Sequence, residues 1–159
     1  MRKILELGSG RSPYSEQQAE VIHLDLVPGP DIEVVMDLNT IAPLFGGKKL
    51  PFPDETFDHA RAFDIIEHVV FVVPLMEEIH RVLKDQGTLF IHTTHYKNPN
   101  AFTDPTHFHA FTLESFDYWD PSTATGARYG YFAIGKFKIL EKKEDYQELA
   151  FTLQKIGSK

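Results

Sequence analysis

The segment Lys3–Pro13, with the sequence KILELGSGRSP, constrains the fold of this chain more than any other. Its short apolar run, Ile4 to Leu7, stops at Gly8-Ser9-Gly10, which is typical of a buried strand that ends in a tight turn. Glycine permits a positive φ and, because it has no Cβ, lets a ligand lie against the backbone. The segment therefore predicts an α/β sheet with a nucleotide-like ligand at the end of its first strand.

The turn lacks the full dinucleotide-binding fingerprint. That fingerprint is G-x-G-x-x-G at the start of a long helix, and Pro13 stands where the third glycine belongs. The next residues, Ser15 to Glu20, are polar, and we expect a short helix there with Ser12 or Ser15 as its N-cap. A G-x-G turn alone fits an ordinary strand-to-loop turn equally well, so the rest of the chain must decide.

The composition limits the classes of protein that the chain can belong to. We expect one globular domain over residues 1–159, with 42% hydrophobic and 25% charged residues. No apolar run reaches membrane-spanning length, and the first strand starts too early for a signal sequence, so we expect a cytoplasmic protein without membrane contact. Zero cysteines exclude disulfides and thiolate sites. A net charge of -7 argues against nucleic-acid binding and favours small-molecule partners.

Two further apolar runs end in aspartates. Asp25 follows the run that begins at Val21, and Asp37 follows Ile32 to Met36. The carboxyl ends of parallel strands meet at one edge of a sheet, where open α/β sheets bind ligands and where an aspartate can hold both ribose hydroxyls. Asp25 alone would also suit a turn before Pro28-Gly29-Pro30. Its repetition at a second strand end favours the ligand site.

The remaining pattern predicts the rest of one α/β domain. The proline-rich connection from Leu50 to Asp58 is expected to be extended and exposed, with a solvated Asp54. Helical spacing from Leu75 to Leu83 predicts a helix that ends by Gly87. The other expected elements are strands at 57–63 and 88–94, a helix N-terminus at Thr112, a loop at 121–131 and a terminal hairpin of strands at 136–143 and 148–155.

Six motifs occur in a fixed order between Leu5 and Ile91: LELGSG, HLDL, VVMDL, LPFPDETFD, IIEHV and EIHRVLKDQGTLFI. Together they resemble the class I S-adenosylmethionine-dependent methyltransferases, particularly the group called type 11. The later stretch DPTHFHAFTLESFDYW, Asp104 to Trp119, is similar to a segment found in bacterial members associated with surface-sugar biosynthesis. The resemblance covers somewhat more than half of the chain.

The resemblance implies a Rossmann-like three-layer sandwich, whose mostly parallel sheet has an antiparallel C-terminal edge hairpin. It implies S-adenosylmethionine as cofactor and methyl transfer to an O or N atom of a small-molecule acceptor, sugar-containing molecules included. By the family's pattern, the methionine part lies near Glu6 and the turn Gly8, Ser9 and Gly10, and the nucleoside near Asp25, Leu26, Asp37 and Leu38. Ala62, Phe63 and Asp64 line the methyl-transfer centre.

A catalytic base does not follow from the resemblance, because methyl transfer from a sulfonium mainly requires alignment. An acceptor hydroxyl or ammonium would nevertheless need a base, and histidine suits neutral pH. Each of His68, His95, His107 and His109 can also be a structural or surface histidine. We assign His68 and His107, with Asp64, to the catalytic site. His107 and His109 alternate like metal ligands near Asp104, but without a further placed ligand we expect no metal.

The segment from His95 to Trp119 is the most aromatic and least regular part of the chain. Because it follows the fifth strand, it leaves the sheet at the edge where the cofactor is expected. A long segment at such a place is more often functional than idle. We therefore expect it to cover the methyl group and to contact the acceptor.

Three departures from the family keep two other functions open. Pro13 replaces a glycine, the family's N-terminal lid helix is missing, and Asp85-Gln86-Gly87 stands where Pro-Gly-Gly is usual. Closure of the cofactor site would then come from residues 95–119 or from a partner chain, such as a homodimer. One alternative is a cofactor-binding module without catalysis. The other is a nicotinamide-dependent dehydrogenase, which leaves LPFPDETFD and Glu67-His68 unexplained.

Overall fold

The structure is a computed structural model that describes residues 1–42 and 46–157. Its helices include α1, the longest at 11 residues, and within the described ranges no helix is long and apolar enough to cross a membrane. The elements in chain order are β1 (Arg2–Leu7), β2 (Ala19–Asp25), β3 (Val34–Val35), η1 (Leu38–Thr40), β4 (Phe57–Phe63), η3 (Ile66–His68), α1 (Val72–Val82), β5 (Leu83–Thr94), α2 (Asn100–Thr103), η4 (Asp117–Trp119), α3 (Ala124–Tyr129), η5 (Gly130–Phe132), β6 (Lys136–Glu144) and β7 (Glu148–Ile156).

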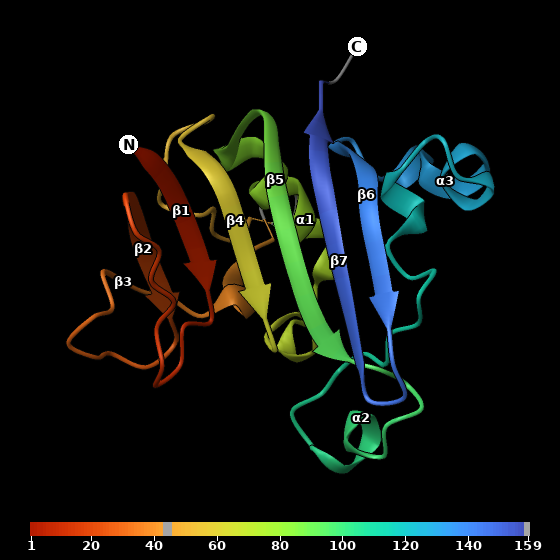
Figure 1. Ribbon diagram of the computed structural model, residues 1–159, viewed down its shortest axis with the longest axis horizontal. Helices are drawn as coiled ribbons and strands as arrows, with labels where there is room; N and C mark the ends of the chain where they lie inside the picture. The colour runs from red at the N-terminus through yellow and green to blue at the C-terminus, as the bar shows by residue number, and fades with distance from the viewer. Residues whose placement is uncertain (43–45, 158–159) are drawn as a thin grey trace.

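The strands form a 7-stranded sheet in the order β3-β2-β1-β4-β5-β7-β6. The pairs from β3 to β5 are parallel, whereas β7 runs antiparallel to both β5 and β6. Figure 1 shows β7 inserted between β5 and β6, with the hairpin at one end of the sheet. The order and directions confirm the expected Rossmann-like fold and its antiparallel C-terminal edge hairpin. They also bring the carboxyl ends of β1, β2, β4 and β5 to one edge.

The two faces of the sheet are covered unequally. On one face Leu89 and Ile91 of β5 are fully buried in a core that includes Leu75 and Ile79 of α1, which lies behind the sheet in Figure 1. On the other face most side chains are half-buried, although Glu6 is 4% exposed. There the Arg61 guanidinium lies 4.5, 4.7 and 5.5 Å from the ring centres of Tyr14, Phe63 and Phe90. The second helical layer of the fold is thus reduced to turns and stacked side chains.

The expected helix at Ser15–Glu20 is wrong. Gln18 has a φ of +62°, and Ala19 already begins β2, where it pairs with Arg2 of β1. Glu16, which would lie inside that helix, instead binds Arg2 at 3.1 Å and accepts a hydrogen bond from the Tyr14 hydroxyl. A polar stretch with serine caps fits a turn as well as a helix. Here the turn forms because the following strand, β2, already pairs with β1 from Ala19 onward.

Three smaller differences concern the ends of elements. The loop expected at 121–131 contains α3, whose N-cap Thr123 accepts a hydrogen bond from the backbone N–H of Gly126. Thr112 accepts from the Glu114 backbone N–H at 3.2 Å, yet only turns follow until η4. Helix α1 ends at Val82, ahead of Gly87, because Leu83 pairs with Phe57 as the first residue of β5.

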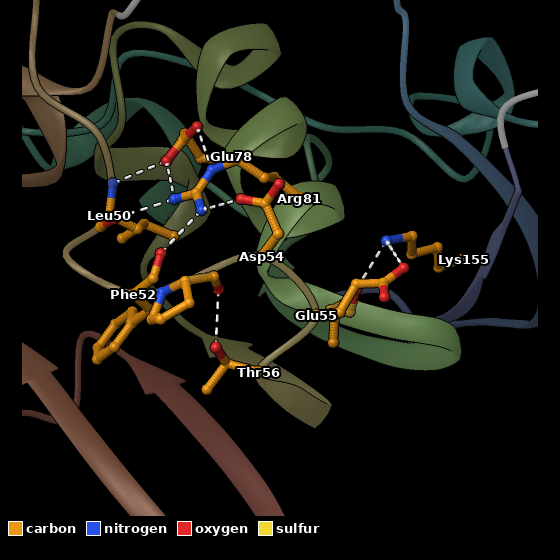
Figure 2. Close-up of polar contacts among 10 residues, drawn as sticks. Leu50, Phe52, Asp54, Glu55, Thr56, Glu78, Arg81 and Lys155 are labelled. Atoms are coloured by element: carbon orange, nitrogen blue, oxygen red, sulfur yellow. Dashed lines mark hydrogen bonds and ion pairs between the residues drawn. The ribbon is translucent and has the colours of Figure 1, made fainter.

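The proline-rich connection is fixed to α1 by one guanidinium. Figure 2 shows that Arg81 donates to the backbone carbonyls of Leu50 and Phe52, at 3.0 and 2.8 Å, and to Asp54 at 2.8 Å. Its other donors bind Glu78, which also accepts from the Leu50 N–H at 2.8 Å. The connection is therefore clamped to α1. It is less extended than expected, because it bends at Pro51 and Phe52 and turns at Asp54 and Glu55, where Glu55 has a φ of +54°. The exposed Asp54 is paired and not simply solvated, and the Arg81 hydrogen bond lowers the pKa of its carboxyl.

Candidate functional site

The glycine turn after β1 is held by the end of β2. The backbone N–H groups of Gly8 and Ser9 donate to the Leu24 carbonyl at 2.8 and 3.3 Å. Gly8 has a φ of +69°, and a Cβ there would lie 2.5 Å from the side chain of Ile65, so this position requires glycine. Gly10 has a φ of +60°, and a Cβ there would meet nothing within 4 Å. The space beside Gly10 can therefore admit a ligand.

Asp25 links the turn to the following loop. Its Oδ2 accepts from the Gly10 N–H and its Oδ1 from the Val27 N–H, both at 2.8 Å. An ionised carboxylate has about four lone-pair sites, so each oxygen keeps one for a further donor. Asp25 is therefore fixed in position and still able to accept two hydroxyl hydrogen bonds, as expected for a residue that holds a ribose.

A cavity of about 110 Å³ lies between the turn and the ends of β2 and β3. Asp37 lines it and accepts from the Asn39 N–H at 2.9 Å, which caps η1. The cavity contains four of the residues predicted from the sequence to bind the nucleoside and the predicted base His68. Its lining is Gly8, Leu24, Asp25, Leu26, Met36, Asp37, Leu38, Asn39, Ile65, His68 and Val69.

His68 lies between this cavity and a second one of about 590 Å³. Asn39 fixes the backbone around it, because its amide donates to the His68 carbonyl at 3.2 Å and its Oδ1 accepts from the Val70 N–H at 2.7 Å. All three predicted catalytic residues, Asp64, His68 and His107, line the second cavity. The other lining residues are Glu67, Thr94, Asn100, Thr103, Asp104, Pro105 and Glu148.

The second cavity is strongly acidic. Glu67 is 2% exposed, and its Oε2 and that of Glu148 are buried without a hydrogen-bond partner. Burial raises the pKa of the Glu148 carboxyl. Asp64, in a left-handed conformation at φ +51°, accepts from the ring of His92 at 2.6 Å. Buried oxygens without partners are costly, so this cavity is suited to a ligand that donates hydrogen bonds or carries positive charge.

Five residues predicted to bind the cofactor line neither cavity, namely Glu6, Ser9, Gly10, Ala62 and Phe63. The Glu6 carboxylate accepts from the Tyr14 N–H at 2.8 Å and lies 3.0 Å from the His23 ring and 3.5 Å from Arg61, on the half-buried face of the sheet. Ala62 is fully buried in the core. Phe63 is 38% exposed and stacks on His92 at 4.1 Å. Ser9 is 6% exposed, with a buried hydroxyl that has no partner.

The segment from His95 to Trp119 reaches the edge that carries both cavities. The Phe108 N–H donates to the Glu67 carbonyl at 2.8 Å, which brings Asp104 and His107 against His68. His109 binds the Val70 carbonyl at 3.2 Å and packs on Phe111, away from this cluster. His95 is 1% exposed, and both its ring nitrogens are engaged, by the Lys97 N–H and by Glu144. His95 is thus a structural residue.

A family model described as a methyltransferase domain matches residues 5–91, more than half of the 159-residue chain. This chain belongs to that methyltransferase family. S-adenosylmethionine is therefore its cofactor. The alternative function, a nicotinamide-dependent dehydrogenase, is not supported by this match. No curated protein sequence gives a significant match to the chain.

Solved structures share the fold of this methyltransferase domain at low sequence identity. An S-adenosylmethionine-dependent methyltransferase from Archaeoglobus fulgidus is 17% identical, with a TM-score of 0.65 over 96% of this chain and 86% of its own. A methyltransferase from Haloferax volcanii, solved with the Trm112 methyltransferase activator, is 13% identical, with a TM-score of 0.66 over 98% and 83%. The [4+2]-cyclase SpnF is 14% identical, with a TM-score of 0.64 over 98% and 75%.

Asp25 lines both the smaller cavity and a neighbouring one of about 530 Å³ that Gly10 also lines, and the residues of the two are chemically compatible with S-adenosylmethionine. The open space beside Gly10 and the free lone pairs of Asp25 suit a ribose that approaches the backbone. Met36, Leu38 and Val69 supply apolar walls for an adenine ring, and Asp37 lies among them. Residues 8–18, which follow β1, contain turns and irregular backbone and no helix.

Sequence reasoning missed several residues of the two cavities. Asn39 could have been found, since it directly follows the Asp37-Leu38 pair that the resemblance singled out. Ile65 and Glu67 lie inside the recognised IIEHV motif, but nothing in the sequence indicates that one packs on Gly8 and the other faces the acidic cavity. Glu148 lies on β7, far away in sequence, and only the antiparallel pairing of β7 with β5 brings it to Thr94.

Proposed function

We propose that this chain is a single-domain methyltransferase that moves a methyl group from S-adenosylmethionine to an O or N atom of a small-molecule acceptor, sugar-containing molecules included. The observation that carries the proposal is the position of His68, which lines both cavities. The smaller cavity, of about 110 Å³, is proposed to receive only part of the nucleoside, with the rest in the neighbouring cavity of about 530 Å³ that Gly10 and Asp25 line. The larger of the two cavities that His68 lines is the proposed acceptor site.

The cofactor brings an activated methyl group on a sulfonium, so the chain has to align the acceptor and manage its proton. Glu67, Asp104 and Glu148 provide oxygens that can accept hydrogen bonds from an acceptor in the larger cavity. His68 and His107, whose rings meet edge-on with centres 4.6 Å apart, are the groups proposed to take up the proton that a hydroxyl or amine releases. Asp64, held by His92, is proposed to orient the acceptor from the opposite wall.

The test is label transfer from methyl-labelled S-adenosylmethionine into the small-molecule fraction of a cell extract. We expect label in the low-molecular-mass products and, once an acceptor is identified, at least a tenfold lower turnover for His107→Ala with nearly unchanged cofactor affinity, about 1.4 kcal/mol of transition-state stabilisation. His109→Ala is the matched control, because it removes the same side chain two residues away, outside both cavities. Loss of cofactor affinity in His107→Ala would instead assign this segment to cofactor closure.

The reduced helical cover favours one alternative, a cofactor-binding module without catalysis. The half-buried sheet face with Arg61 and Phe63, and the missing helix after the glycine turn, support it. Cofactor binding without any label transfer would select this alternative over the enzyme. Absence of cofactor binding would exclude both.

A homodimer and a cytoplasmic location are further parts of the proposal. The Haloferax volcanii methyltransferase is solved with an activator protein, and a partner chain over the half-buried sheet face would give this domain comparable support. Light scattering on the purified chain tests the dimer. A molecular mass equal to that of the monomer at high micromolar concentration would contradict it. Fractionation of cells with an antibody against the chain tests the cytoplasmic location.

A further inference from the structure

The acceptor cavity contains a cluster of two imidazoles and a carboxylate. One ring nitrogen of His68, one of His107 and one oxygen of Asp104 all lie within 4.8 Å of one another. Asp104 and His107 come from the segment after β5, and His68 from η3, and the hydrogen bond from the Phe108 N–H to the Glu67 carbonyl holds the two together. The sequence pattern paired His107 with His109, whereas the fold replaces His109 by His68.

The hydrogen bonds of Thr106 determine which nitrogen of His68 is free. The Thr106 hydroxyl lies 2.6 Å from Asp104 Oδ1 and 2.9 Å from His68 Nδ1. An ionised carboxylate only accepts, so the single hydroxyl proton goes to Asp104, and the hydroxyl oxygen accepts from His68 Nδ1–H. In the neutral imidazole Nε2 then carries a lone pair. A histidine whose Nδ1–H is held by a protein oxygen has the usual arrangement of a metal ligand and its supporting partner.

The other two members have free ligand atoms as well. Asp104 Oδ1 accepts from both the backbone N–H and the hydroxyl of Thr106, which leaves Oδ2 available. The His107 side chain is only 8% exposed, and its Nε2 lies 3.9 Å from Asp104 Oδ2, too far for a hydrogen bond. Its Nδ1 is buried without a partner. A buried imidazole in this state is expected to bind something that the protein itself does not supply.

We propose that His68, Asp104 and His107 form a binding site for one divalent transition-metal ion, Zn²⁺ or a chemically similar ion such as Co²⁺. Two imidazoles and one carboxylate suit such ions better than Mg²⁺, which prefers oxygen ligands. The three residues line the acidic cavity, where Glu67 and Glu148 would add negative charge near a bound ion. If the proposed acceptor site is correct, the ion would bind the acceptor hydroxyl there and lower its pKa. His68 and His107 would then act as ligands of the ion, and the carboxylates of Glu67 and Glu148 would take up the released proton in their place. The metal site itself does not depend on that function.

The test is metal binding to the untagged, chelator-treated chain without any cofactor or acceptor. We expect Co²⁺ to bind with a stoichiometry of one and to give visible d–d absorption, and calorimetry to show Zn²⁺ binding at micromolar or lower concentration and at least a hundredfold weaker Mg²⁺ binding. Binding stronger for Mg²⁺ than for Zn²⁺ would overturn the proposal, and so would the lack of any signal at millimolar Co²⁺.

Variants assign the bound ion to this cluster. His107→Ala and the nearly isosteric Asp104→Asn should each weaken Co²⁺ binding at least tenfold, whereas His109→Ala should leave it unchanged. His92→Ala is the second control, because Asp64, His92 and Glu148 form another group of potential ligands. Loss of Co²⁺ binding in His92→Ala, with His107→Ala unaffected, would overturn the proposed assignment. Far-UV circular dichroism of each variant shows whether a loss of binding reflects a loss of folding. None of these measurements depends on methyl-transfer activity.

Discussion

Arg81 donates two hydrogen bonds to Glu78, one turn earlier on α1, through Nε at 2.9 Å and Nη2 at 2.7 Å. The same guanidinium binds the carbonyls of Leu50 and Phe52. Two motifs that lie far apart in the sequence, LPFPDETFD and EIHRVLK, are therefore the two halves of one contact (Figure 2). Their joint occurrence in the chain has a structural cause, because either half alone would leave buried polar groups unpaired.

We expect Arg81→Ala to reduce the free energy of unfolding by about 3 kcal/mol, because it leaves the carboxylate of Glu78, whose side chain is 4% exposed, buried without its cation. The measurement is the urea midpoint. Lys84→Ala is the control, since its pair with Asp58 is largely exposed, with side-chain exposures of 43% and 34%, and should cost at most about 1 kcal/mol. Equal shifts for the two variants would mean that Arg81 acts as an ordinary surface cation.

Asp25→Ala should weaken S-adenosylmethionine binding by about 1.5–3 kcal/mol, roughly 10- to 150-fold, because a carboxylate that holds two hydroxyls makes charge-assisted hydrogen bonds. Calorimetry with S-adenosylmethionine measures this. Asp85→Ala is a better control than Asp54→Ala, since Asp54 is paired with Arg81 and Asp85 is exposed near the opposite end of β5. The ribose assignment is wrong if the two variants bind equally well.

The two glycines of the turn should respond differently to alanine. Gly8→Ala combines a positive φ with a 2.5 Å clash against Ile65, and we expect a loss of about 3 kcal/mol of stability. Gly10→Ala has the φ cost alone, about 1 kcal/mol, but its methyl group enters the space proposed for the cofactor. Thermal unfolding and calorimetry on both variants test this. Unchanged cofactor affinity in Gly10→Ala would show that the ligand lies elsewhere.

The stability of the domain should fall as the pH is lowered from about 6.5 to about 4, in part through His59. Burial lowers the pKa of His59 to about 4 in the folded chain from 6.5. Between these values the unfolded chain binds a proton that the folded chain does not, so acidification favours unfolding by about 3 kcal/mol in total. The urea midpoint should change less with pH across this range in His59→Gln than in the unmodified protein. The glutamine can still bind the Thr88 hydroxyl. An identical pH profile for the two proteins would contradict the shift.

Much of the fold could be predicted from the sequence, because its apolar runs are short and sharply bounded. The run before Gly8 and the alternating pattern around Phe151 each permit only one assignment. The polar stretch from Ser15 to Glu20 has residue types that are common both in turns and at helix starts. Its structure is determined by the pairing of β1 with β2, which the local sequence does not show. The contact between His68 and His107 could not be predicted, since it depends on how the irregular segment after β5 packs on η3.

The helix-free crossing from β1 to β2 bears on which nucleotides this domain can accept. In dinucleotide-binding folds a helix N-terminus after the glycine turn supplies the partial positive charge that attracts the pyrophosphate. Here residues 8–18 contain only turns, and the carboxylates of Asp25 and Asp37 line the smaller cavity. A phosphorylated nucleotide would meet repulsion without that compensating attraction, whereas a phosphate-free sulfonium nucleoside would not. We therefore expect the missing helix to disfavour phosphorylated adenosine cofactors in this chain relative to S-adenosylmethionine.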